Sequence, residues 1–434
     1  MPINKKYLFG SIGMVLALCV AQVLGSTPLI LLCLAAFLVL VGWSCSKNYT
    51  LPILLFFLPW SPILRTSPTG YSFFTFALVL VCGISVLKKR FRFPKYPLVA
   101  GILLLFLTLL SKVIDGQSLA FSYIAFMMLI VIFPIVKGEW PVRKYDFFHI
   151  AVFFSLGVAI AALCALFLDV FPNIAKYIRV DTYSTIIRRC GFYGDPNFYT
   201  AQITAAMGGC LLLILREKKV GRTALLGILV VVLVYCGFLS GSKSFVLISA
   251  CEFGIWLIAL LRLQGRKGLK IGALIAVAVL AVTVASSTLF TNLIDVVITR
   301  FSSSKDISSF TTGRTELWIS YLEEILGNAK IFFLGKGFTN VKVAGKASHN
   351  TLLQCVFQFG FFGVPILTYW VISFFRGTSL RRLSRRGTVL ESLMVIIGAF
   401  LPWMAIDALF FDEFFLLQWY VFSALQQLQY QDET

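Results

Sequence analysis

Long, nearly uninterrupted runs of apolar residues constrain this chain more than any other feature of its sequence. We read fourteen of them, near residues 8–24, 28–45, 51–64, 72–87, 97–111, 119–136, 147–170, 198–215, 223–240, 244–261, 271–290, 350–375, 389–409 and 412–428. A helix needs about 20 mostly apolar residues to cross the hydrocarbon layer of a bilayer. The sequence therefore predicts an all-α, polytopic integral membrane protein with about fourteen transmembrane helices in a single membrane domain, residues 1–434.

The overall composition agrees with a membrane protein and argues against a soluble one. Of the 434 residues, 59% are hydrophobic and only 13% are charged, whereas a soluble globular protein carries about 25% charged residues. The net charge of +19 does not indicate nucleic-acid binding here, because Lys and Arg collect in the cytoplasmic loops of membrane proteins.

The positions of the basic residues predict the orientation of the spans. With a cytoplasmic N-terminus and fourteen spans, the inner segments hold 24 of the 38 Lys and Arg residues and every basic cluster, including Lys88-Lys89-Arg90-Phe91-Arg92. This distribution follows the positive-inside rule and places both termini in the cytoplasm. The first run follows Lys5 and Lys6 as a signal peptide would, but no small-residue cleavage site follows it, so we expect a retained span.

Two of the predicted outer segments are long and unusually basic. The first outer loop covers residues 171–197, and the large outer loop covers residues 291–349; together they hold most of the outward-facing Lys and Arg residues. The positive-inside rule disfavours cations there, so an anionic ligand is one explanation. The other is that long loops cross the membrane regardless of their charge.

The large outer loop contains the pattern of an amphipathic helix over about 313–327. Its apolar residues are Leu317, Trp318, Tyr321, Leu322, Ile325 and Leu326, which fall on one stripe of a helix. Arg314 lies in the first turn, where the helix dipole disfavours a cation and an anion would be held by free amides and the guanidinium. The alternatives are that Arg314 extends into solvent or pairs with Glu316.

A second helix start stands just before the eighth run, at Gly194-Asp195-Pro196-Asn197. Asp followed by Pro is a favourable N-cap and first helical position, so we interpret Asp195 as a cap in preference to a catalyst. Asn197 is suited to capping or to binding a sugar hydroxyl. Arg188 and Arg189 precede this turn and are available for a ligand.

The chain has two histidines. His149 begins the seventh run on the cytoplasmic side, and we expect it to fill space at the interface. His349 lies at the outer end of the twelfth run, where a neutral imidazole beside water is suited to act as a general base. A structural role for His349 is the alternative, since a single histidine at a helix mouth is weak evidence for catalysis.

Three further charged groups have several interpretations. Lys243 lies in the short turn Ser240-Gly241-Ser242-Lys243-Ser244, Glu252 lies deep in the tenth run, and Asp407 lies near the outer end of the thirteenth. Because an unpaired charge inside a membrane is costly, Glu252 is expected to be protonated or paired within the bundle. Asp407, with Asp412 and Glu413 in the following turn, is equally compatible with an interfacial role and with binding an acceptor.

Four segments together resemble the O-antigen ligase and O-antigen polymerase superfamily. They are Arg188-Arg189-Cys190-Gly191-Phe192-Tyr193-Gly194-Asp195-Pro196-Asn197, the turn Ser240–Ser244, Thr312-Gly313-Arg314-Thr315-Glu316-Leu317-Trp318, and Leu334-Gly335-Lys336-Gly337 followed by Ser348-His349-Asn350. Their order and their shared outer location carry the resemblance, which covers residues from about 188 to 360. The first seven runs match only in hydropathy.

This resemblance implies a GT-C-like membrane glycosyltransferase that uses a polyprenyl-diphosphate-linked glycan. In that family a histidine deprotonates the acceptor hydroxyl, arginines hold the diphosphate, and neither a metal nor another cofactor is needed. Carried to this chain, His349 is the base, and Arg188 and Arg314 bind the diphosphate. Arg189 is an alternative to Arg188, and Lys243 stands where the family has Arg, which removes a planar bidentate donor.

The resemblance further implies that Asn197, Asn350 and Asp195 either contact the sugar and acceptor or are structural. It places the protein in the cytoplasmic membrane of a bacterium, with a glycan, lipid or cell-wall acceptor and with a chain-length regulator as a further candidate partner. A polymerase is slightly favoured over a ligase, because nothing in the chain suggests recognition of a core lipid. The competing class is a flippase for lipid-linked oligosaccharides, for which internal repeats and short outer loops are expected.

Overall fold

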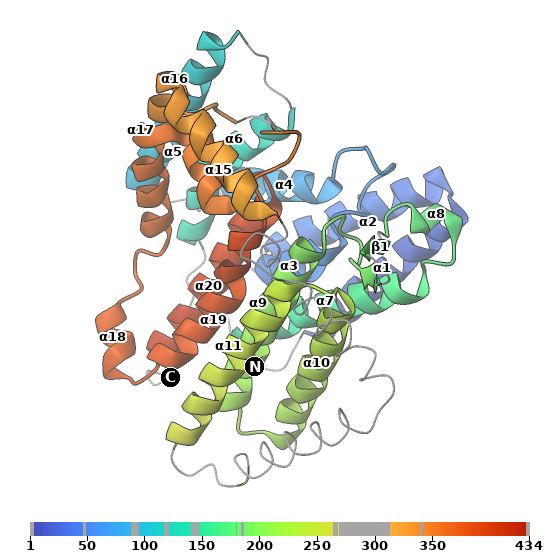
Figure 1. Ribbon diagram of the computed structural model, residues 1–434. Helices are drawn as coiled ribbons and strands as arrows, with labels where there is room; N and C mark the ends of the chain where they lie inside the picture. Colours follow the sequence, from blue (N-terminus) through green and yellow to red (C-terminus); the bar gives the residue numbers. More distant parts are fainter. Residues whose placement is uncertain are drawn as a thin grey trace.

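The computed structural model describes residues 4–46, 49–87, 95–116, 121–139, 147–178, 180–183, 186–263, 268, 313–338 and 342–430. Helices dominate this part of the chain (Figure 1). Eight of them are long and apolar enough to cross a membrane: α1 (Lys5–Leu24), α2 (Thr27–Ser46), α5 (Lys95–Ile114), α7 (Phe147–Phe167), α9 (Pro196–Arg216), α10 (Val220–Leu239), α11 (Lys243–Arg262) and α17 (Thr351–Phe374). The protein is therefore a helical membrane protein.

The remaining helical elements are shorter or less apolar. They are α3 (Thr50–Phe57), η1 (Leu58–Trp60), α4 (Phe73–Leu87), α6 (Phe121–Glu139), α8 (Pro172–Ala175), α15 (Arg314–Gly327), α16 (Ala329–Leu334), α18 (Leu380–Arg385), α19 (Val389–Phe400), η3 (Leu401–Ala405) and α20 (Asp412–Tyr430). The predicted run 271–290 lies outside the described residues. The number of fourteen spans stays a prediction, since α3, α4 and α19 are shorter than the ~20 residues that a span requires.

The third run forms a buried helix that is too short to be a simple span. Helix α3 changes to the 3-10 turn η1 at Leu58, and Pro59 has no N–H to continue an α-helix. Gly157 of α7 lets the two backbones approach closely, because a Cβ atom there would lie 2.2 Å from the carbonyl oxygen of Phe56. The segment is therefore part of the protein core.

Helix α9 forms the centre of one bundle and is almost entirely buried. It packs against α7, α10, α11 and α19 (Figure 1). Small residues permit this packing: Cβ atoms at Gly208 and Gly209 would lie 2.5 Å from the Glu252 Oε1 atom and 1.7 Å from the Tyr420 hydroxyl oxygen. The N-terminus of α9, which begins at Pro196, is consequently held in a fixed position among its neighbours.

The first outer loop contains a small β-hairpin, which the all-α prediction did not include. Strand β1 (Val180–Tyr183) pairs antiparallel with β2 (Ile186–Arg189), with Asp181 opposite Arg188. Helix α8 precedes the hairpin, and the Asn173 side chain donates a hydrogen bond to the Val23 carbonyl at 3.0 Å. The hairpin carries Arg188 and Arg189 as consecutive strand residues.

Helix α17 is broken at Gly360, whose backbone angles (φ 62°, ψ −171°) are not helical. The break frees carbonyl groups that normally bond within the helix. The N–H groups of Lys336 and Gly337 donate to the carbonyls of Phe357 and Gln358, each at 2.9 Å. Non-helical backbone at membrane depth requires such internal partners, so the Leu334-Gly335-Lys336-Gly337 segment and the break in α17 depend on each other.

Helices α15 and α16 cover the first half of α17 (Figure 1). Helix α15 begins after Gly313, close to the predicted range of 313–327, and Gly313 has the left-handed φ of 74°. Leu317, Tyr321 and Ile325 of α15 form a buried cluster with Phe357. The apolar stripe of α15 thus packs on the neighbouring helices, while Leu322 and Leu326 of the same stripe remain exposed.

Candidate functional site

His349 stands directly before the N-terminus of α17. Asn350 is the N-cap of that helix, and its side-chain oxygen accepts hydrogen bonds from the N–H groups of Leu352 and Leu353 at 3.0 and 3.2 Å. His349 has a positive φ of 49°, which non-glycine residues rarely adopt. The buried Asn350 therefore has a structural capping role, and the backbone conformation fixes where the His349 side chain leaves the chain.

The carboxylate of Asp407 holds the backbone around His349. It accepts hydrogen bonds from the His349 N–H at 3.0 Å, from the Asn350 N–H at 3.3 Å and from the Ser348 hydroxyl. The Thr351 hydroxyl in turn donates to the Ile406 carbonyl at 2.7 Å. Asp407 is thus a central group of the site, and its role was left open by the sequence because it depends on a contact 58 residues away in the chain.

Asp195 both caps α9 and faces the imidazole of His349. Its Oδ1 atom accepts a hydrogen bond from the Asn197 N–H at 2.6 Å, and its Oδ2 atom lies 4.0 Å from His349 Nδ1. About a third of each side chain is exposed to solvent. The capping role expected of Asp195 is therefore present, together with a second position beside the candidate base.

Arg314 reaches the same region from the N-terminus of α15. Burial lowers the pKa of the Arg314 guanidinium, the Asp195 and Asp407 carboxylates raise it, and Arg188 lowers it further. The Asp195 and Asp407 carboxylates and the Arg188 guanidinium are thus close enough to Arg314 to act on its charge. The start of α15 points toward the middle of the molecule, where α20 and α9 also begin (Figure 1).

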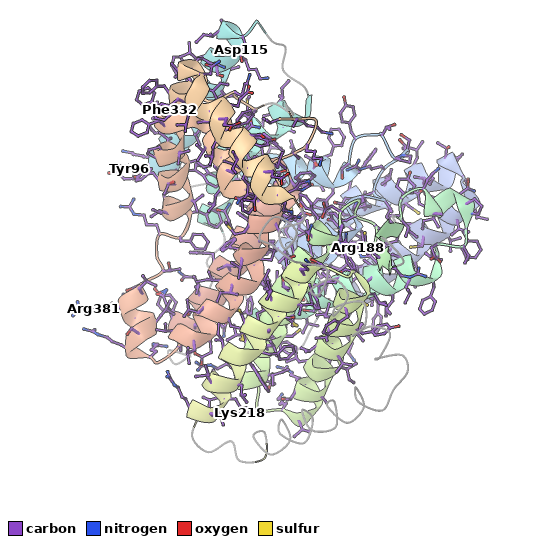
Figure 2. The ribbon with its side chains drawn as sticks, in the orientation of Figure 1. Tyr96, Asp115, Arg188, Lys218, Phe332 and Arg381 are labelled. Carbon is purple, nitrogen blue, oxygen red and sulfur yellow. The ribbon has the colours of Figure 1, made fainter. Side chains whose placement is uncertain are left out.

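The hairpin separates Arg188 from Arg189. Consecutive strand residues point to opposite faces: Arg188 Nε donates to the Ser240 carbonyl at 3.0 Å, whereas Arg189 forms an ion pair with Asp169. Arg188 is buried near the centre of the molecule (Figure 2). Only Arg188 therefore lies in the region of Arg314. The two arginines that the sequence offered as alternatives thus have different positions.

Asn197 joins the start of α9 to the Ser240–Ser244 turn. Its side-chain oxygen accepts hydrogen bonds from the hydroxyls of Ser242 at 3.0 Å and Ser244 at 3.2 Å. Ser242 is also the N-cap of α11, and Lys243 is the first, half-buried residue of that helix. Asn197 is consequently engaged in structure, and the turn is held close to the carbonyl that binds Arg188.

Helix α15 also positions the segment before His349. Trp318 Nε1 donates to the Ser348 carbonyl at 2.9 Å, and the Tyr321 hydroxyl donates to the Lys346 carbonyl at 3.0 Å. The helical spacing of these two aromatic residues predicted packing, and Trp318 also ends one of the four motif segments, but neither observation predicted these hydrogen bonds. The polar atoms of the two side chains tie α15 to the backbone leading into His349.

The interactions above define a group of five residues, His349, Asp195, Asp407, Arg314 and Arg188. We name it the outer polar cluster after the side of the membrane on which the sequence predicts it. It combines an imidazole, two carboxylates and two guanidinium groups contributed by four segments that are far apart in the sequence. Among the described residues, no group of three or more His, Cys, Asp and Glu side chains is arranged to hold a metal ion. The arrangement is suited to moving a proton at His349 next to a place where an anion is neutralised.

Comparison with known proteins adds no assignment. No protein-family model matches the chain, and no curated protein matches it.

Proposed function

We propose that the protein is a membrane glycosyltransferase of the O-antigen ligase and polymerase type. It transfers or polymerises oligosaccharide from a polyprenyl-diphosphate carrier on the outer face of the cytoplasmic membrane of a bacterium. The observation that carries the proposal is the outer polar cluster, in which the candidate base His349 lies 4.0 Å from a carboxylate and in the same region as Arg314 and Arg188.

The chemistry follows from these groups. His349 removes the proton of the acceptor hydroxyl as the oxygen attacks the anomeric carbon, and the carbon–oxygen bond to the diphosphate breaks in the same step. Arg314 and Arg188 neutralise the charge that develops on the departing diphosphate. A direct displacement of this kind inverts the configuration at the anomeric carbon and requires the base and the leaving group on opposite sides.

Asp195 has a defined part in this proposal. Its carboxylate lies on the Nδ1 side of the imidazole, so it favours the tautomer in which Nδ1 carries the proton and Nε2 is free to accept one. Asp407 holds the backbone N–H of His349 and acts as a positioning residue. Lys243 supplies positive charge close to the start of α11, without the bidentate geometry of Arg.

The predicted topology supports an outward-facing site. In the view of Figure 2, Lys218 of a predicted inner loop lies at the bottom and Asp115 of a predicted outer loop at the top, with Arg188 between them. Fourteen spans, a GT-C-like architecture and cytoplasmic termini complete the proposal. A chain-length regulator is a candidate partner of a polymerase, which we favour slightly over a ligase.

The test is the fate of lipid-linked glycan units in cells that carry His349→Ala, with His149→Ala as the matched control. His149 packs against Tyr49, far from the outer cluster in sequence and on the predicted inner side. We expect His349→Ala to accumulate unused units on the outer leaflet and His149→Ala to process them normally. Normal glycan in the His349→Ala cells would contradict the role of His349 as the base. Units trapped on the inner leaflet would indicate the alternative, a flippase.

A further inference from the structure

A cavity of about 420 Å³ lies beside the outer polar cluster and is not part of it. Its walls come from the loop after η1, from α4 and α6, and from the start of α20. The volume is within the range of ~300–1,000 Å³ that is usual for small-molecule sites. The position and the lining of this cavity indicate what it binds.

One end of the cavity is rich in hydrogen-bonding groups. Asp412, Glu413, Thr75, Arg65 and Tyr71 all line it. The Thr75 hydroxyl donates to both carboxylate oxygens of Asp412, at 3.1 and 3.3 Å. The carboxyl groups of Asp412 and Glu413 thus add several hydrogen-bond acceptors to this part of the lining.

Most of the rest of the lining is apolar, and part of it is exposed on the surface of the protein. It includes Val79 and Phe76 of α4 and Ile124, Met128 and Leu129 of α6. Phe76, Ile124 and Met128 are each at least 40% exposed. A ligand that fills the whole cavity is therefore an amphiphile whose hydrocarbon part lies between α4 and α6.

The polar end favours a sugar as the head group of that amphiphile. Carboxylates and hydroxyls match the many hydroxyl donors of a sugar, and the aromatic rings of Tyr71 and Phe411 offer apolar faces next to them. A phosphate head group would lie against two carboxyl groups, with the single guanidinium of Arg65 to compensate its charge. The outer polar cluster differs in offering two guanidinium groups, those of Arg314 and Arg188.

A short segment joins the cavity to the outer polar cluster. Asp407 binds the backbone of His349, and Phe410, Phe411 and Glu413, a few residues further on, line the cavity. The ring of Phe411 also contacts Phe198 of α9, with centroids 4.6 Å apart. The cavity is therefore attached to the same structural elements that hold His349.

Hydrogen bonds also fix the wall between the cavity and α9. Gln202 Nε2 donates to Glu413 Oε1 at 2.8 Å and to the Tyr193 hydroxyl at 2.6 Å. Tyr193 in turn donates to the Leu58 carbonyl at 3.0 Å. The carboxylate of Glu413 is thus held at one place in the cavity before any ligand arrives.

We propose that the cavity between α4, α6 and the start of α20 is a binding site for a sugar-headed amphiphile, which is the acceptor side of the transfer. Such an acceptor, with no phosphate between sugar and hydrocarbon, is that of the ligase alternative and not that of a polymerase. The acceptor assignment rests on the proposed function, while binding of the amphiphile does not. The proposal predicts a preference for a neutral sugar head over a phosphate head when the hydrocarbon tail is the same.

The experiment measures saturable binding of two radiolabelled probes, dodecyl maltoside and dodecyl phosphate, to the purified full-length protein in amphipol. We expect one saturable maltoside site per chain and at least tenfold weaker binding of the phosphate. Ala125→Phe fills the cavity, and Asp412→Asn removes one carboxylate. Each is expected to weaken maltoside binding at least tenfold, whereas Leu32→Phe, on the exposed face of α2, leaves it unchanged.

Equal binding of both probes, or maltoside binding that survives both Ala125→Phe and Asp412→Asn in folded protein, would overturn the proposal. His349→Ala separates it from the proposed function. This variant is expected to bind maltoside as the unaltered protein does, even though it no longer transfers glycan. Binding without transfer in the unaltered protein would contradict the transferase and leave the site for the amphiphile intact.

Discussion

The outer polar cluster and Glu252 are two places in this membrane protein where acidic side chains occur, and their surroundings differ. In the outer polar cluster, Asp407 accepts hydrogen bonds from backbone N–H groups and Asp195 caps a helix while facing His349. Glu252 of α11 is fully buried, and in the part of the chain that the structure describes neither of its carboxyl oxygens has a hydrogen-bond partner.

The difference lies in what surrounds the carboxyl groups. A charge is tolerated where N–H groups, guanidinium groups and water compensate it, as they do beside His349. Glu252 is enclosed by glycines instead: Cβ atoms at Gly208 and Gly398 would lie 2.5 and 2.1 Å from its Oε1 atom. Of the two expected states, pairing is not seen among the described residues, so the physical argument favours an uncharged Glu252.

The largest effect is expected from Arg314→Ala. Removal of a guanidinium from the outer polar cluster leaves the diphosphate charge poorly compensated and is expected to lower the transfer rate about 10²–10³-fold, as loss of one electrostatic donor does in other enzymes. Arg314→Lys is expected to restore only part of the rate. The measurement is glycan transfer by purified protein, with Arg189→Ala as the control, since Arg189 pairs with Asp169 on the other face of the hairpin.

Asp407→Asn is expected to have the next largest effect. The amide cannot accept all three hydrogen bonds from Ser348, His349 and Asn350, and hydrogen bonds to a charged group contribute about 1.5–3 kcal/mol each. The turnover rate falls about 10–10²-fold while acceptor affinity changes less. An unchanged turnover rate, or an equal loss in Asp169→Asn, would show that Asp407 does not position the imidazole.

Gly398→Ala tests how tightly Glu252 is enclosed. The new Cβ lies 2.1 Å from Glu252 Oε1 and 2.8 Å from the Thr204 carbonyl oxygen, so helix α19 has to shift away from α9 and α11. Overpacking of this kind costs about 1–3 kcal/mol. Thermal unfolding of the purified protein measures it, and Gly254→Ala, where nothing lies within 4 Å of the new Cβ, is the neutral control.

The smallest effect is expected from Glu252→Gln. An amide of nearly the same shape replaces an uncharged carboxyl, so stability changes by less than about 1 kcal/mol and the transfer rate is unchanged. Thermal unfolding and glycan transfer measure both quantities. Loss of transfer in Glu252→Gln would mean that this carboxyl carries a charge that the reaction uses, and the contrast with the outer polar cluster would then disappear.

Local patterns predicted the helices but not the contacts between them. The range of α15 and the cap at Asp195 follow from residue types within one turn of a helix, whereas the cap at Asn350 was not predicted. The break at Gly360 does not, because a single glycine in an apolar run is compatible with a continuous helix. It becomes necessary only when the backbone of Gly335 approaches, 2.5 Å from the position of a Cβ at residue 360.

The candidate site shows the same limit. Residue types and the four motif segments singled out His349, Arg188 and Arg314 as chemical groups. Three features depend on how distant segments pack. Asp195 faces His349, Arg188 and Arg189 point to opposite faces of the hairpin, and Asp407 binds the backbone of His349. No periodicity within one segment contains that information.

The break in α17 has a consequence for how the site responds to the bilayer. The half of the helix that follows His349 is tied to α15 and α16 and to the Lys336 and Gly337 amides, whereas the half after Gly360 continues into the membrane to Phe374. The hydrogen-bond ladder of α17 does not run through Gly360, so the half that carries the imidazole and the half that follows Gly360 are positioned by different contacts. A lipid-driven tilt of the second half is therefore expected to bend α17 at Gly360 before it reaches His349.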